Sequence, residues 1–166
     1  IYPAQWQKFL APVAEEKRGS LIAAYHEMLF GEDEAGRLKA AKAWADWESY
    51  LIRFEPQDVD EDAYQSLAIA RLENHYFVNG AFLGGKGPSN RSQNFILENV
   101  HRLLTIPIRI VHGRFDNVCP MFQADELVDA LRRAGHESVE LRRPPAGHSM
   151  TERENCLALT DIIEQL

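Results

Sequence analysis

The sequence lacks the features that mark metal-binding, nucleic-acid-binding and membrane-spanning proteins. Its two cysteines and six histidines show no metal-ligand spacing and no pattern of a disulfide framework. The net charge of −7 opposes binding to phosphate backbones and anionic membranes, and the basic residues form no stripe. No apolar run approaches the roughly 20 residues that a membrane-spanning helix needs. We therefore expect a soluble, cytoplasmic protein with no metal or cofactor and with no nucleic-acid or membrane partner.

Helical spacing of apolar residues dominates the first part of the chain. The 166 residues, of which 45% are hydrophobic, suffice for a domain with a core, and the start at Ile1 rather than at a methionine leads us to expect a fragment or a processed product. Glycines at positions 31 and 80 close two of the expected helices. Helices are predicted at about 3–10, 14–30, 33–51, 62–78 and 95–104, with loops at 53–62 and 84–89.

The rest of the chain is organised around a short β-strand and the loop that follows it. Residues 108–111 are mostly β-branched, which favours a buried strand, and Gly113 ends it. Asp116 follows on the loop at the carboxyl end of this strand, where open α/β sheets build their sites. An amphipathic helix closed by Gly135 and a second strand at 138–141 complete a βαβ unit.

His148 lies on the loop after the second predicted strand. Because both loops of a βαβ unit open on the same edge of the sheet, we expect Asp116 and His148 to meet there. A carboxylate that orients a histidine makes it a general base for a hydroxyl nucleophile. Taken singly, Asp116 fits an ordinary turn residue and His148 a surface residue. Their occurrence together, after successive strands, favours the catalytic interpretation.

The final helix is predicted to begin near Thr151. The Thr151 hydroxyl and the Glu154 carboxylate, three residues apart, have the pattern of a capping box. The expected apolar face of this helix has five members: Leu157, Leu159, Ile162, Ile163 and Leu166.

The segments His112–Pro120 and Gly147–Ser149 resemble the acid and histidine loops of an α/β-hydrolase, specifically of the proline iminopeptidase family. The resemblance extends over essentially the whole chain. It implies an α/β fold in which residues 1–100 form an all-helical cap domain and residues 101–166 form the last βαβα edge of a parallel sheet. Only two strands are predicted, so the remaining strands of such a sheet are expected outside this chain.

The nucleophile of the resembling triad is missing. None of the serines lies in a Gly-x-Ser-x-Gly turn, which presents the nucleophile in α/β-hydrolases. The resemblance thus implies the C-terminal part of a serine aminopeptidase that releases N-terminal proline from peptides, and a chain that is inactive alone. Two alternatives stay open. One is a fragment of another capped α/β-hydrolase, such as an esterase or epoxide hydrolase, and the other is a non-catalytic fragment that self-associates through an exposed sheet edge.

Two glutamates occupy apolar faces of the predicted helices. Glu48 lies one turn after Trp44, and Glu73 has aliphatic and aromatic residues one turn away on either side. A buried carboxylate implies a cation, either a substrate ammonium group or a structural partner such as Arg71 or a lysine, and the spacing leaves both open. The resemblance implies that Glu48 and Glu73 bind the free imino group of an N-terminal proline and that Phe77 lines the proline pocket.

Overall fold

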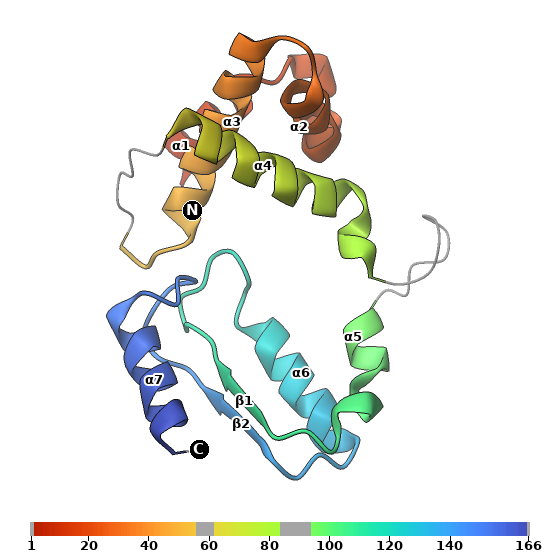
Figure 1. Cartoon of the computed structure of the whole chain (residues 1–166), viewed down its shortest axis with the longest axis vertical. Coiled ribbons are helices and arrows are strands. Elements are labelled where there is room, and N and C mark those ends of the chain that lie inside the picture. The colour runs from red at the N-terminus through yellow and green to blue at the C-terminus, as the bar shows by residue number, and fades with distance from the viewer. Residues whose placement is uncertain (1, 56–61, 84–93, 166) are drawn as a thin grey trace. The chain divides into compact units, whose positions relative to one another are not determined.

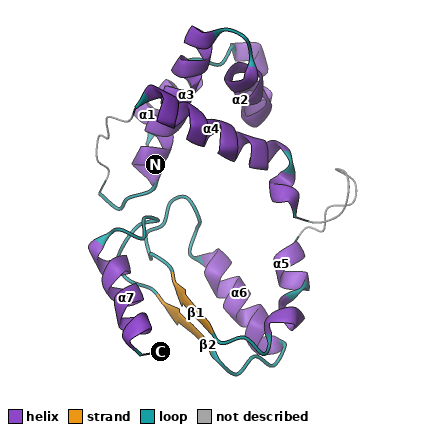
Figure 2. Cartoon of the chain, in the orientation of Figure 1, coloured by secondary structure: helices purple, strands orange, loops and turns teal. Residues whose placement is uncertain are grey.

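The computed structural model describes residues 2–55, 62–83 and 94–165. These residues pack into two compact units. The first takes its residues from Ile1–Tyr50 and Gln57–Phe82, and the second from Leu51–Pro56 and Leu83–Leu166. Figure 2 shows helices throughout the first unit and, among the described residues, both strands in the second.

The first unit is helical, in agreement with its apolar spacing. Asp62 caps one helix by accepting the backbone N–H groups of Tyr64 and Gln65 at 3.0 Å, and Pro3 starts another, where a missing N–H costs nothing. The elements are α1 (Pro3–Leu10), the 3₁₀ segment η1 (Glu15–Ser20), α2 (Leu21–Phe30), α3 (Glu34–Leu51), α4 (Ala63–Val78) and the 3₁₀ segment η2 (Gly80–Phe82).

Aromatic rings form the core of the first unit. The ring of Phe9 stacks on that of Tyr25 with 4.6 Å between centroids, and the ring of Trp44 meets Tyr25 edge-on at 5.2 Å. Tyr25 is fully buried, and its hydroxyl donates to the backbone carbonyl of Phe9 at 2.6 Å. Because the polar atom is satisfied, this tyrosine joins α1, α2 and α3 without leaving a buried group unpaired.

The second unit contains the βαβ arrangement. Its elements are α5 (Phe95–Glu98), the 3₁₀ segment η3 (Val100–Leu103), β1 (Ile108–Val111), α6 (Phe122–Arg133), β2 (Val139–Arg142) and α7 (Arg153–Glu164). The strands β1 and β2 pair in parallel, with Ile108 opposite Val139. Helices α6 and α7 lie on either side of the two strands (Figure 1). The described chain is therefore mostly helical with a small parallel sheet, and both strands were predicted from the sequence.

Three predictions about helix boundaries were wrong. The helix expected over 95–104 divides at Asn99, whose φ of −110° and ψ of 12° are not helical, into α5 and the 3₁₀ segment η3. The helix expected over 14–30 divides at Ser20, whose φ of −145° and ψ of 78° are not helical, directly after the weak helix former Gly19. The capping box at Thr151 is absent, since α7 begins at Arg153 and no side chain caps it. Glu152 holds the N-cap position instead, and its carboxylate turns back toward the loop before it.

The expected apolar faces are only partly buried in this chain. In α7, Ile162 is buried but Leu157 and Ile163 are 53% and 67% exposed. In α4, Leu72 is 61% exposed, and the buried residues lie on another face of that helix. Periodicity thus located the helical regions but did not identify which apolar side chains pack against other described residues.

The predicted functional division, a cap over 1–100 and a core edge over 101–166, stays a prediction. The packing divides the chain at other positions, because α5 and η3 contact α6 and the segment Leu51–Pro56 belongs to the second unit. The loop predicted at 84–89, most of the loop predicted at 53–62, and Leu166 lie outside the described residues. Within the described ranges, no helix is both long enough and apolar enough to cross a membrane.

Candidate active site

The loops that leave β1 and β2 are joined backbone to backbone. Three hydrogen bonds of 2.9–3.0 Å continue beyond the sheet, from the N–H groups of residues 112, 114 and 115 to the carbonyls of residues 142, 144 and 146. A Cβ at Gly113 would lie only 1.9 Å from the carbonyl oxygen of Gly147, so no other residue fits there without moving the backbone. This close approach fixes the acid loop against the histidine loop.

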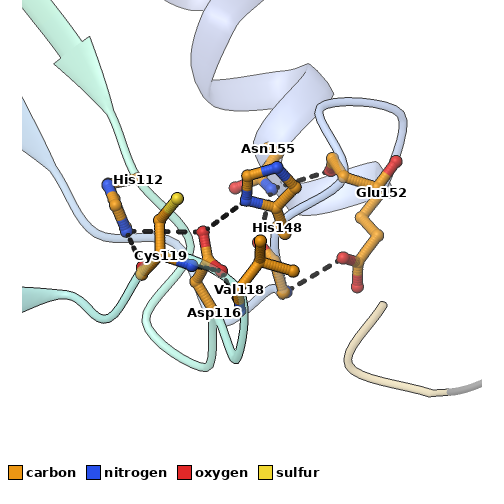
Figure 3. Close-up of polar contacts among 9 residues, drawn as sticks. His112, Asp116, Val118, Cys119, His148, Glu152 and Asn155 are labelled. Carbon is orange, nitrogen blue, oxygen red and sulfur yellow. Dashed lines mark hydrogen bonds and ion pairs between the residues drawn. The ribbon is translucent and has the colours of Figure 1, made fainter. Parts of the chain in front are cut away.

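Asp116 and His148 meet at this junction, as the βαβ geometry predicts. The Nδ1 atom of His148 lies 2.9 Å from Oδ2 of Asp116 (Figure 3). The aspartate side chain is 4% exposed, whereas the histidine side chain is 40% exposed. The pair therefore combines a sheltered acid with a histidine that solvent or a ligand can reach.

The second oxygen of Asp116 serves the loop. Its Oδ1 atom accepts the backbone N–H groups of Val118 and Cys119, each at 2.8 Å. This is the turn geometry of an ordinary loop aspartate. One oxygen of Asp116 therefore stabilises the turn, and the other is held toward His148. The turn geometry and the contact with the histidine occur together in one side chain.

The hydrogen bond to Asp116 determines which nitrogen of His148 carries the proton. An ionised carboxylate only accepts, so Nδ1 must be the donor, and the neutral ring then has its lone pair on Nε2. Nε2 has no partner among the residues that the structure describes. A half-exposed imidazole with a free basic nitrogen has the chemistry of a general base.

A second histidine contacts the same carboxylate. Nε2 of His112 donates to the carbonyl oxygen of Cys119 at 2.7 Å and lies 3.4 Å from Oδ2 of Asp116.

Burial raises the pKa of the Cys119 thiol, and the negative charge of Asp116 raises this pKa further. The thiol is thus kept protonated, which disfavours Cys119 as a nucleophile.

Two residues that support His148 were not recognised in the sequence. Nδ2 of Asn155 donates to the carbonyl oxygens of Gly147 and Ser149, at 3.1 and 2.9 Å, and the carboxylate of Glu152 accepts the N–H of Gly147 at 2.9 Å. Both side chains come from the start of α7. No local sequence motif indicates this role, because an acid or an amide near the start of a helix is usually interpreted as a cap of that helix.

The predicted amine-binding residues lie in the first unit. The carboxylate of Glu73 accepts the indole N–H of the buried Trp44 at 2.8 Å. The ring of Phe77 stacks on the same Trp44 with 6.0 Å between centroids and is 51% exposed. Trp44 therefore brings Glu73 and Phe77 together, and Glu48 follows Trp44 by one turn of α3.

The structural partner considered for Glu73 is engaged elsewhere. Nε of Arg71 donates to the carbonyl oxygen of Leu29 at 2.7 Å, and its guanidinium lies 5.3 Å from the ring centroid of Phe30. In the described part of the chain, no lysine or arginine forms an ion pair with Glu73. The Trp44 indole is a neutral donor, so it orients the carboxylate without compensating its charge.

The described part of the second unit contains a cavity that does not include Asp116 or His148. A cavity of about 610 Å³ in the second unit is lined by residues of α5, β1 and α6 together with His112 and Cys119. Asp116 and His148 are not among its described lining residues. Within the described ranges, no three His, Cys, Asp or Glu side chains are arranged to hold a metal ion.

Comparison with known proteins relates this geometry to a family. No protein-family model matches the chain. The chain is 54% identical over 166 residues to a proline iminopeptidase of Neisseria gonorrhoeae, a match that covers 100% of this chain and 50% of that protein. The chain belongs to the proline iminopeptidase family. The resemblance stated from the sequence is thereby confirmed.

Other members of the proline iminopeptidase family match in the same way. The protein from Neisseria meningitidis serogroup A is 53% identical over 166 residues, covering 100% of this chain and 50% of its own length. The one from Xanthomonas citri is 41% identical over 165 residues, covering 96% of this chain and 49% of its own length. The chain thus spans about half the length of the curated relatives it matches, which are α/β-hydrolases.

Proposed function

We propose that this chain is the C-terminal part of a serine aminopeptidase that releases N-terminal proline from peptides by acyl transfer. Asp116 and His148 are its acid and general base, and Glu48, Glu73 and Phe77 bind the terminal proline. In this proposal the described units are part of a helical cap and the last edge of an α/β-hydrolase sheet. The observation that carries the proposal is the 2.9 Å contact between Asp116 and the half-exposed ring of His148.

The proposed reaction uses His148 twice. Its Nε2 first takes the proton of a serine hydroxyl as that oxygen attacks the carbonyl carbon of the proline residue, and Asp116 stabilises the imidazolium that forms. The same proton then passes to the departing amine, which leaves an acyl-enzyme. Water hydrolyses this ester by the same proton transfers in reverse order. Acyl transfer of this kind needs no cofactor.

The serine is assigned to a part of the enzyme outside these 166 residues. None of the serines here lies in a Gly-x-Ser-x-Gly turn, and the relatives are about twice as long. We therefore propose that the isolated chain is inactive and that its exposed apolar side chains favour self-association. A cytosolic location is part of the proposal, and the two free cysteines are compatible with it.

Recognition of the substrate amine is assigned to the first unit. A protonated N-terminal proline needs an acceptor for its N–H groups and a negative charge, and Glu73 offers both in an orientation fixed by Trp44. The exposed face of Phe77 provides an apolar surface beside it. Names of the relatives support this assignment, since all those cited are called proline iminopeptidases.

The test uses the full-length enzyme and three substrates. Proline-β-naphthylamide should be hydrolysed, and N-acetylproline-β-naphthylamide should be hydrolysed far more slowly. A simple acyl ester, which carries no amine, serves as the reference for hydrolysis without amine recognition. A serine-directed organophosphonate should abolish the activity. Hydrolysis of the ester or of an epoxide with no turnover of proline-β-naphthylamide would refute the aminopeptidase assignment in favour of another capped hydrolase.

A further inference from the structure

The carboxylate of Glu152 bridges two chain segments that are far apart in the sequence. Oε1 accepts the backbone N–H of Gly147 at 2.9 Å, and Oε2 accepts the backbone N–H of Phe54 at 3.2 Å. One acceptor belongs to the loop that carries His148, and the other belongs to the segment that follows α3. Both segments lie in the second unit, so this bridge is internal to it.

The segment after α3 contacts the histidine loop at two further points. The N–H of Ser149 donates to the carbonyl oxygen of Ile52 at 2.7 Å. A Cβ at Gly147 would lie 2.6 Å from the nitrogen of Phe54 and 2.8 Å from Oε1 of Glu152, so the glycine is required by this close approach. The polar backbone atoms on both sides of His148 are thus held by Ile52, Glu152 and Asn155.

Asp116 alone does not position the histidine. It restrains only one atom of the ring, Nδ1, and the ring is 40% exposed. The direction of the free Nε2 atom therefore depends on where the backbone of residue 148 lies. That backbone is flanked by Gly147 and Ser149, whose N–H and carbonyl groups are held from outside the loop.

We propose that Glu152 is a positioning residue for His148. Its carboxylate keeps the histidine loop against the segment 52–54, and thereby keeps Nε2 aimed at the nucleophile. The inference rests on the proposed function, since it assigns Glu152 a part in the same proton transfers. A misplacement of about 1 Å in a catalytic group can lower turnover by about 100-fold.

A different role for Glu152 is the stabilisation of α7. An acidic residue at the N-terminus of a helix interacts favourably with its dipole. The side chain of Glu152 makes no capping hydrogen bond to α7, which favours the positioning role. Glu154, two residues further on and in the first turn of the same helix, provides a matched control, because Glu154→Gln removes the same charge near the same helix end.

The experiment compares Glu152→Gln, Glu152→Ala and Glu154→Gln in the full-length enzyme. We expect kcat to fall by about 100-fold in Glu152→Ala with KM changed by less than about threefold. Glu152→Gln keeps one acceptor oxygen and loses the other, so its kcat should be intermediate. Glu154→Gln should match the wild type within about twofold. Titration of the active serine with an organophosphonate gives the fraction of folded enzyme by which each kcat is normalised.

A second readout is independent of turnover. The Nδ1 proton of His148, hydrogen-bonded to Asp116, should give a downfield proton resonance in the wild type and in Glu154→Gln, and this resonance should broaden or vanish in Glu152→Ala. An unchanged resonance together with a normalised kcat within threefold of wild type would overturn the inference. If the wild type itself releases no proline, the proposed function fails, and the resonance alone then decides the role of Glu152.

Discussion

Replacement of Asp116 by asparagine is the sharpest perturbation of the proposed site. The two backbone N–H groups at 2.8 Å, from Val118 and Cys119, require an oxygen in front of them. The asparagine amide therefore keeps its oxygen on that side and turns its NH₂ group toward His148. An NH₂ group cannot accept from Nδ1, so the imidazole shifts its proton to Nε2, and the lone pair of the ring moves from Nε2 to Nδ1.

The expected loss in the full-length enzyme follows from that change of tautomer. The same substitution in a serine protease lowers kcat by about 10⁴-fold, which corresponds to about 5 kcal/mol of activation free energy. We expect a loss of this order in kcat for Asp116→Asn, with little change in KM, because residues that bind the substrate are untouched. The fold should survive, since both turn hydrogen bonds remain.

The assay is proline-β-naphthylamide hydrolysis measured over a range of substrate concentrations. Asp129→Asn serves as the control, because Asp129 is an exposed aspartate on α6 with the same charge. Asp116→Asn should also cause no further loss in a His148→Ala background, since the two residues act as a unit. A loss below tenfold, or losses that multiply in the double variant, would refute the role of Asp116.

Three further outcomes are expected. The purified 166-residue chain should release no naphthylamine from proline-β-naphthylamide above a heat-killed control, and measurable turnover would show that the nucleophile is present in it. In the full-length enzyme, Glu73→Gln should weaken proline-β-naphthylamide binding by about tenfold or more and reduce the preference over the acetylated substrate, because a hydrogen bond to a charged group contributes about 1.5–3 kcal/mol. The control is Glu16→Gln, at an exposed glutamate. An unchanged preference in Glu73→Gln would place amine recognition elsewhere. Iodoacetamide at pH 8 should modify the exposed Cys156 before Cys119, because burial and the negative charge of Asp116 raise the pKa of the Cys119 thiol and reduce its thiolate fraction. Mass spectrometry of the digested protein follows the labelling of both cysteines. Faster labelling of Cys119 would contradict the raised pKa of its thiol.

The sequence alone predicted the structure correctly where interactions between neighbouring residues determine the backbone conformation. The β-branched run at 108–111 and the glycine at 135, which adopts a φ of +92° at the end of α6, each allow few alternatives. The meeting of Asp116 and His148, 32 residues apart, was predictable from topology, because a βαβ unit brings successive loops to one sheet edge. Their chemical roles remain predictions until the enzyme is assayed.

The supporting contacts were not predictable, because they depend on distant residues. Glu152 is an acid at a helix start, where local rules assign it to the helix, yet its oxygens accept from Gly147 and from Phe54. Glu73 was expected among aliphatic neighbours of its own helix, and the residue that orients it is Trp44 of α3. Periodicity along one helix carries no information about which partner another segment supplies.

The path of the chain through the second unit has a consequence for folding. The hydrogen bond between Phe54 and Glu152 spans 98 residues, and the whole of α4 lies between these two positions. Contacts between residues so far apart in the sequence form late in folding, because the conformational entropy of the intervening chain must be lost before they form. During synthesis, the segment at 52–54 leaves the ribosome long before the histidine loop that it supports. The geometry around His148 should therefore be among the last features to form, and a truncated product that starts after residue 82 should retain β1 and β2 but leave the histidine loop without this support.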